Sequence, residues 1–178
     1  NIKGKIQGSC DIEINDTGIK QAEELSNKVL ENKYKFSKIY SSPQRRAVKT
    51  AEILSKATNV EYIPIKGLEE INFGEWEGLT WPEVKEKYPT EYEEWYKNRR
   101  YTKPPKGESY QDMLLRVLTS MHKIISENCD NVVIVTHSAV IMCIQCCLTD
   151  TPFNKMTKFK ADNTSITEID SDLLMQLQ

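Results

Sequence analysis

Three stretches, far apart in the chain, carry side chains of the kinds that bind anions or transfer protons. They are Arg45-Arg46 in SSPQRRAVKTA, the carboxylate-rich run LEEINFGEWEGLTW, and His137 in NVVIVTHSAV. A guanidinium grips an anion with parallel hydrogen bonds, an imidazole binds it or moves a proton, and a carboxyl beside apolar walls keeps its proton longer. These residue types suit chemistry on an anion such as phosphate, provided that the fold brings them together.

His137 follows four β-branched residues, 132–135, which do not alternate with polar ones. Such a run predicts a central strand of a parallel sheet, buried on both faces. The small residues Ser138-Ala139 and the apolar stretch VIMCIQCCL predict a tight turn and a helix directly afterwards. We therefore expect His137 at the carboxyl end of a central strand, where open α/β sheets bind ligands. A histidine satisfied within the core is an equally good interpretation of this residue by itself.

The arginine pair follows a short strand predicted at 38–40. Ser42 is the expected N-cap of the next helix and Pro43 its first residue, which puts both arginines in the first turn. The helix dipole disfavours cations there, so their placement indicates a nearby anion held by the guanidinium and the helix terminus. A solvated surface pair is the alternative.

The carboxylate-rich run interleaves Phe73, Trp76 and Trp81 with four glutamates. Aromatic walls can raise the pKa of one carboxyl and suit it to work as a general acid. Most of these glutamates are nevertheless expected to be ordinary surface residues.

Strand and helix patterns alternate along the chain. Strands are predicted at 38–40, 61–65, 132–135 and 165–169, and helices at 15–33, from 42, from 80, at 91–98 and from 109. Asn15 or Asp16 is the expected cap of the first helix. Pro64 marks the second strand as an edge, and Thr80-x-x-Glu83 and Ser109-x-x-Asp112 have capping-box spacing. The alternation predicts an α/β fold, a single domain over 1–178 with three α/β/α layers and a mainly parallel central sheet.

Composition excludes several classes of protein. A net charge of −2 over 178 residues argues against a general nucleic-acid binder, and no apolar run approaches a membrane span. Three of the five cysteines fall in one apolar stretch, which indicates small buried thiols in a reducing cytoplasm. Cys143-x-x-Cys146 lacks the second pair of ligands that a structural metal site needs, so no metal is predicted.

The motifs, taken in order, resemble the histidine phosphatase superfamily, in the branch with cofactor-dependent phosphoglycerate mutases and small bacterial phosphatases. The matching segments are GKIQG (4–8), GIKQAEEL (18–25), SSPQRRAVKTAEIL (41–54), LEEINFGEWEG (68–78), GES (107–109), VVIVTHSAVI (132–141) and NTSI (163–166). The resemblance covers nearly the whole chain. It implies a phosphoglycerate mutase-like fold with a phosphate pocket at the carboxyl ends of the central strands.

The resemblance also assigns roles. Arg46, rather than Arg45, takes the place of the family's second phosphate-binding arginine, and Glu70 takes that of its general acid. His137 takes the place of the second active-site histidine. The other positions implied near the phosphate are Asn1, Gln7 and Ser138, the last standing where a glycine is commoner.

One hallmark of the family is missing from the sequence. Its nucleophilic histidine lies in an Arg-His-Gly triplet just upstream of the position that matches Asn1, and His122, predicted in mid-helix, cannot replace it. We expect the encoded protein to carry the triplet and the chain as given to be inactive without it. The alternative is a noncatalytic, phospholigand-binding remnant.

The resemblance implies a metal-free and cofactor-free phosphatase that acts on small-molecule phosphate monoesters through a phosphohistidine. The segment 79–106 is expected to cover the pocket like a lid. Mutases of the family generally have a longer segment, so a phosphatase is favoured and a mutase is the alternative. Its aromatic residues are similar to those of α-ribazole phosphatases, but for any single ring packing between the lid's own helices is the favoured explanation. The sequence leaves the oligomeric state open.

Overall fold

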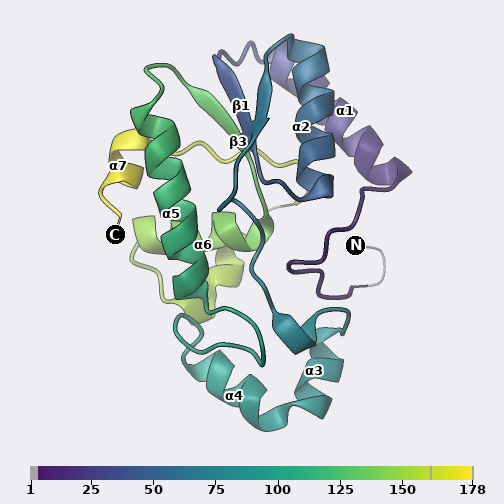
Figure 1. Ribbon diagram of the computed structural model, residues 1–178, viewed down its shortest axis with the longest axis vertical. Helices are drawn as coiled ribbons and strands as arrows, with labels where there is room; N and C mark the ends of the chain where they lie inside the picture. Colours follow the sequence, from purple (N-terminus) through teal and green to yellow (C-terminus); the bar gives the residue numbers. More distant parts are fainter. Residues whose placement is uncertain (1–3, 161, 178) are drawn as a thin grey trace.

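Three parallel strands form the sheet of the computed structural model, which describes residues 4–160 and 162–177 (Figure 1). They are β1 (Lys38–Ser41), β2 (Tyr62–Pro64) and β3 (Val132–Val135), in the order β2-β1-β3. In the register of the sheet, Tyr40 lies beside Ile63 on one side and Ile134 on the other. The prediction that 61–65 is an edge strand is confirmed, with the strand itself limited to Tyr62–Pro64.

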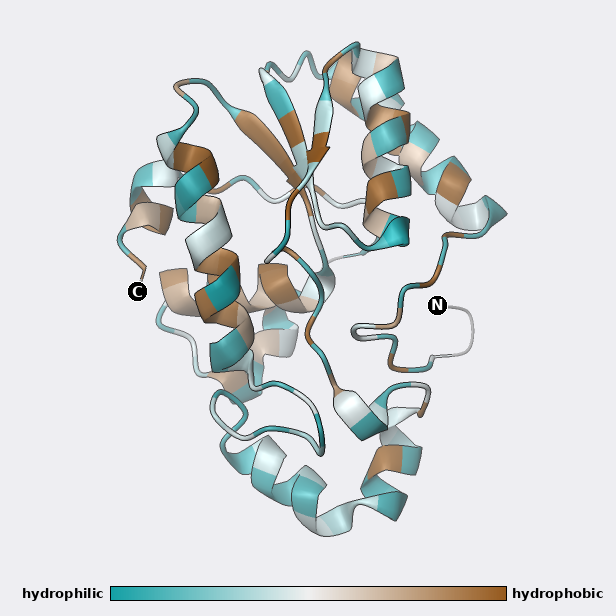
Figure 2. Ribbon diagram, viewed as in Figure 1, coloured by the Kyte–Doolittle hydropathy of each residue, from teal (hydrophilic) through white to brown (hydrophobic). Residues whose placement is uncertain are grey.

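Helices cover both faces of the sheet, as the three-layer prediction requires. On one face lie α1 (Asp16–Glu31) and α2 (Arg45–Thr58), and on the other α5 (Tyr110–Ser126) and α6 (Ser138–Leu148) (Figure 1). Side chains alternate along β1, so that Ile39 packs in the cluster of α1 and α2 while Tyr40 packs in the cluster of α5 and α6. Figure 2 shows the hydrophobic residues concentrated in the strands and the adjoining helix faces.

An aromatic cluster fills the end of the molecule below the sheet, around η1 (Gly74–Trp76), α3 (Trp81–Lys87) and α4 (Pro89–Lys97) (Figure 1). We define it as Phe73, Trp76, Trp81, Tyr88, Tyr92, Trp95 and Tyr110. Its neighbouring ring centroids lie 5.3 to 6.5 Å apart, mostly edge to face or tilted. Trp76 and Trp95 are completely buried at its centre. The remaining elements are η2 (Phe153–Phe159) and α7 (Ser171–Met175).

The predicted caps of three helices are confirmed. The Asn15 side chain accepts the backbone N–H of Gly18 at the start of α1. Both capping boxes are present, Thr80 with Glu83 in α3 and Ser109 with Asp112 in α5. These caps satisfy backbone donors that a helix start leaves without an internal partner.

The predicted start of α2 is wrong. The helix begins at Arg45, and its N-cap is Gln44 rather than Ser42. The chain stays extended beyond β1 because the backbone N–H of Ser42 still donates to Val135 of β3, at 2.8 Å. The Ser42 hydroxyl is therefore placed at the strand end, where it meets His137 instead of capping the helix.

Two strand predictions are also wrong. The strand β3 is not central, because within the described residues it pairs with β1 alone and its four residues are half-buried. The segment 165–169 forms no strand, since its polar–apolar alternation meets no neighbouring strand to accept its hydrogen bonds. Among the described residues, no helix combines the length and the apolar character needed to cross a membrane.

Candidate active site

The ends of β1 and β3 meet at the imidazole of His137. Ser42 directly follows β1, and its Oγ lies 2.8 Å from His137 Nε2. His137 is the N-cap residue of α6, and only 7% of its surface is exposed. The carboxyl edge of the parallel sheet thus carries a buried imidazole, at the place where this class of fold binds ligands.

The surroundings of His137 favour its neutral form. Burial, reinforced by the positive charges of Arg46 and Arg116, lowers the pKa of His137 to about 3. A dianion bound between His137 and Arg46 would offset the positive charges and raise the pKa of His137.

Arg46 points inward and Arg45 outward, although they are adjacent in sequence. The Arg46 guanidinium donates to the carbonyl oxygens of Gly8 at 2.8 Å and Cys10 at 2.7 Å. Burial lowers the pKa of Arg46, and the nearby carboxylate of Glu70 opposes that shift. Arg45 is exposed and pairs with Glu13, so the surface-pair interpretation holds for Arg45 only.

Glu70 enters the same region from the loop that follows β2. One carboxylate oxygen accepts the backbone N–H of Ile71 at 3.0 Å, and the other accepts that of Ala139, in the first turn of α6, at 3.3 Å. Burial raises the pKa of Glu70, against the opposing effects of these hydrogen bonds and of Arg46 and Arg116. A carboxyl with a raised pKa beside a cationic anion-binding group is suited to donate a proton to a leaving group.

Gln44 joins these segments, and the sequence analysis did not single it out. Its amide nitrogen donates to the Gly8 carbonyl at 3.2 Å, and its amide oxygen accepts the backbone N–H of Glu70 at 2.8 Å. It is buried and lies two residues before Arg46. A polar residue between a strand end and a helix was the only available signal.

Arg116 of α5 holds the loop that carries Glu70. Its guanidinium donates to the carbonyl oxygens of Gly67, Glu69 and Glu70 at 2.8 to 3.0 Å and forms two hydrogen bonds with the carboxylate of Glu108. All of these partners are distant from it in sequence or lie in irregular structure. The sequence alone therefore could not separate Arg116 from an ordinary polar position on an amphipathic helix.

An open cavity of about 540 Å³ adjoins Glu70. Its other lining residues are Ser9, Gly67, Glu69, Asn72, Lys106, Gly107, Glu108 and Arg116. The loop 67–72 and the end of the predicted lid segment face each other across it.

The remaining predicted positions are less informative. Asn1 lies outside the described residues. Gln7 is half-buried, and Ser138 is the exposed first residue of α6. His122 lies 3.0 Å from the carbonyl oxygen of Leu174, through Nε2, which agrees with the structural role expected for it. Within residues 4–160 and 162–177, no three His, Cys, Asp or Glu side chains gather as metal ligands would. A metal-free reaction remains a prediction.

Comparison with known proteins identifies the family. Residues 1–173 match the histidine phosphatase superfamily (branch 1). The chain belongs to this superfamily. Phosphoserine phosphatase 1 from Hydrogenobacter thermophilus is 30% identical over 170 residues, which are 95% of this chain and 80% of the relative. A phosphatase is the activity that these relationships support.

Solved structures agree with the fold. Phosphoserine phosphatase from Entamoeba histolytica, determined in complex with 3-phosphoglyceric acid, is 30% identical with a TM-score of 0.77, and the match covers 92% of this chain and 81% of the other. The α-ribazole phosphatase from Shigella flexneri matches with a TM-score of 0.78 at 23% identity, over 92% of this chain and 81% of that one. The second likeness concerns the fold alone.

Proposed function

We propose that the protein hydrolyses phosphate monoesters of small molecules at a site formed by His137, Arg46 and Glu70, through a phosphohistidine intermediate. The observation that carries the proposal is the convergence of an imidazole, a guanidinium and a carboxyl of raised pKa at the carboxyl edge of the sheet. They come from three separate segments, and hydrogen bonds to the backbone fix the orientation of Arg46 and Glu70.

The proposed reaction has two steps. A histidine nitrogen, expected in an Arg-His-Gly segment encoded upstream of Asn1, attacks phosphorus while the bond to the leaving oxygen breaks and Glu70 gives that oxygen its proton. The Glu70 carboxylate then takes a proton from water, whose oxygen attacks phosphorus and releases phosphate and the free histidine. Arg46 and His137 bind the equatorial oxygens throughout, where charge builds up.

The proposed substrates are small phosphorylated metabolites. Phosphoserine is suggested by the names of relatives about 30% identical, and α-ribazole 5′-phosphate by the aromatic residues of 79–106. Most of those rings pack against one another, which weakens the argument for stacking on a base. Tyr96 and Tyr101, 49% and 58% exposed, remain open to solvent. A comparison of kcat/KM for the two esters decides between these candidates.

Glu70→Gln in the longest chain that the gene encodes tests the assignment. We expect kcat/KM for an alkyl phosphate to fall by about 10²–10⁴. An aryl phosphate should lose much less, because its leaving oxygen needs little protonation. The wild-type rate should decline as pH rises through the raised pKa of Glu70, and the glutamine variant should lose this dependence. Glu93→Gln is the matched control, because Glu93 is exposed and pairs with Lys97 in α4. Equal losses on both ester classes would refute the general-acid role.

The same preparation separates the alternatives. Phosphate release that survives a chelator supports the hydrolase, whereas transfer of the phosphoryl group between phosphoglycerate hydroxyls supports a mutase. Binding of inorganic phosphate without turnover by the longest encoded chain supports a noncatalytic phospholigand-binding protein. Residues 1–178 alone are expected to bind phosphate without turnover.

A further inference from the structure

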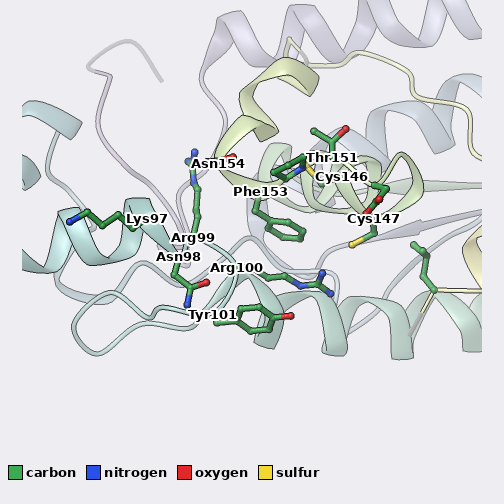
Figure 3. Close-up of a pocket in the computed structure, with 13 residues that line it drawn as sticks. Lys97, Asn98, Arg99, Arg100, Tyr101, Cys146, Cys147, Thr151, Phe153 and Asn154 are labelled. Carbon is green, nitrogen blue, oxygen red and sulfur yellow. The ribbon is translucent and has the colours of Figure 1, made fainter.

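A second cavity lies at the opposite end of α6 from His137. It has a volume of about 490 Å³, and its walls come from the segments 97–101 and 146–154 and from Leu177 (Figure 3). Cys147 lies in the last turn of α6, ten residues after His137. At a rise of about 1.5 Å per residue, the two are roughly 15 Å apart along the helix. The cavity is therefore separate from the site proposed for phosphate chemistry.

The thiol of Cys147 in this cavity has the features of a nucleophile. Its sulfur is turned toward the guanidinium of Arg100 (Figure 3), and Cys143 lies one turn earlier in α6. The neighbouring Cys143 thiol and the positive charge of Arg100 lower the pKa of Cys147 below its usual value, against the effect of burial. The pKa of the buried Cys143 thiol is raised, so Cys143 stays protonated, and its sulfur lies 3.9 Å from the Tyr110 carbonyl oxygen.

The charges around the cavity favour an anion. The lining includes three cationic side chains, those of Lys97, Arg99 and Arg100, and a single carboxylate, that of Asp150. Within the described residues, no carboxylate lies within ion-pair distance of Arg99 or Arg100.

The strongest evidence for an anion in this cavity is the buried guanidinium of Arg99. The residue is only 9% exposed, and its Nε has no hydrogen-bond partner. Its charge is met chiefly by the faces of Trp95, 4.5 Å from the ring centroid, and Tyr110, at 5.5 Å. A buried guanidinium with an unused donor is stabilised by an anion that enters the cavity.

We propose that Cys147 is a modification site for anionic low-molecular-weight disulfides. The Cys147 thiolate attacks one sulfur of the disulfide, a new S–S bond forms to Cys147, and the other half leaves as a thiolate that takes a proton from water. The adduct persists because Cys143, the nearest thiol, is buried and protonated and so is a poor attacking group. Arg99 and Arg100 select for carboxylates on the incoming molecule.

The test treats residues 1–178 with oxidised glutathione, which is anionic, and separately with cystamine, which is cationic. Peptide mapping by mass spectrometry then gives the rate at each cysteine. Cys10 and Cys129 serve as internal references, being accessible thiols outside the cavity. The lowered pKa of Cys147 should make it the fastest-reacting cysteine near pH 7. The ratio of the oxidised-glutathione rate to the cystamine rate should be higher at Cys147 than at Cys129.

The Arg100→Gln variant should reduce that ratio at Cys147 and leave it unchanged at Cys129. Added salt should reduce it in the unchanged chain, which provides the test if the variant does not fold. A glutathione adduct that forms as fast at Cys10 or Cys129, or an equal charge preference at Cys147 and Cys129, would overturn the proposal. Neither result bears on phosphate hydrolysis.

Discussion

The candidate active site and the aromatic cluster both bury large side chains, but different forces hold them. In the site, Arg46, Glu70, Gln44 and Arg116 are each anchored by hydrogen bonds to backbone groups of other segments. In the aromatic cluster, ring packing dominates, and the buried indole N–H of Trp95 has no hydrogen-bond partner in the described chain. Hydrogen bonds fix the direction and charge of a group, whereas ring packing fixes mainly volume. Substitutions should therefore affect function through the first region and stability through the second.

The largest stability effect should come from the aromatic cluster. Trp95→Ala removes the ring that packs on Phe73, Trp76, Trp81 and Tyr110 and should lower the free energy of unfolding by about 3–5 kcal/mol. The neighbouring Tyr96→Ala, at a ring that is half-exposed, should lower it by about 0.5 kcal/mol or less. Urea denaturation of both variants measures the difference. Similar losses would mean that the packing of this region is not concentrated at Trp95.

A smaller loss of stability, with a functional signature, is expected at Arg116. Arg116→Ala leaves the carbonyls of the Glu70 loop and the Glu108 carboxylate without their donor, and should lower the free energy of unfolding by about 1–3 kcal/mol. It also removes a positive charge that lowers the pKa of Glu70, so the alkaline limb of kcat/KM should move to higher pH. Lys123→Ala, at an exposed position of the same helix, is the control. A stability loss with an unmoved limb would limit Arg116 to a structural role.

The smallest effect concerns the acid side of the stability profile. The pKa of His137 is about 3 in the folded protein, whereas the ordinary value near 6.5 applies to the unfolded chain. As pH falls below 6.5, the imidazole therefore takes up a proton in the unfolded chain but not in the folded protein. Stability attributable to His137 is therefore present above pH 6.5 and is lost on acidification, by about 1 kcal/mol between pH 7 and 5.5. The free energy of unfolding of the His137→Gln variant, measured by urea titration, should change less with pH over this range. Identical slopes for the two proteins would contradict a buried, neutral imidazole.

The sequence predicted local features of the helices and strands better than the contacts between segments distant in the chain. The caps at Asn15, Thr80 and Ser109 were correct because a cap is a bond between residues three apart or closer, which spacing reveals. The predicted cap at Ser42 was wrong because the Ser42 backbone N–H donates to Val135 of β3, and local spacing does not reveal such a long-range hydrogen bond. The segment 165–169 failed because alternation describes a strand only when another strand lies beside it.

The residues of the candidate site also divide into those that the sequence indicated and those that only the structure revealed. Spacing and the family resemblance pointed to Arg46, Glu70 and His137, and in the structure the charge of Arg46 acts on the pKa of both Glu70 and His137. Neither revealed Gln44 or Arg116, whose partners lie 26 to 49 residues away in the chain.

The order of residues alone determined most of the strands and helices, which residue types reach the sheet edge, and the family to which the chain is similar, since each depends on local spacing. Only the tertiary structure decided that His137 is neutral, that the Glu70 carboxyl holds its proton more tightly, and that Arg45 and Arg46 face opposite ways. Proton affinity depends on the burial and the charges that surround a group, and those surroundings come from segments distant in the chain.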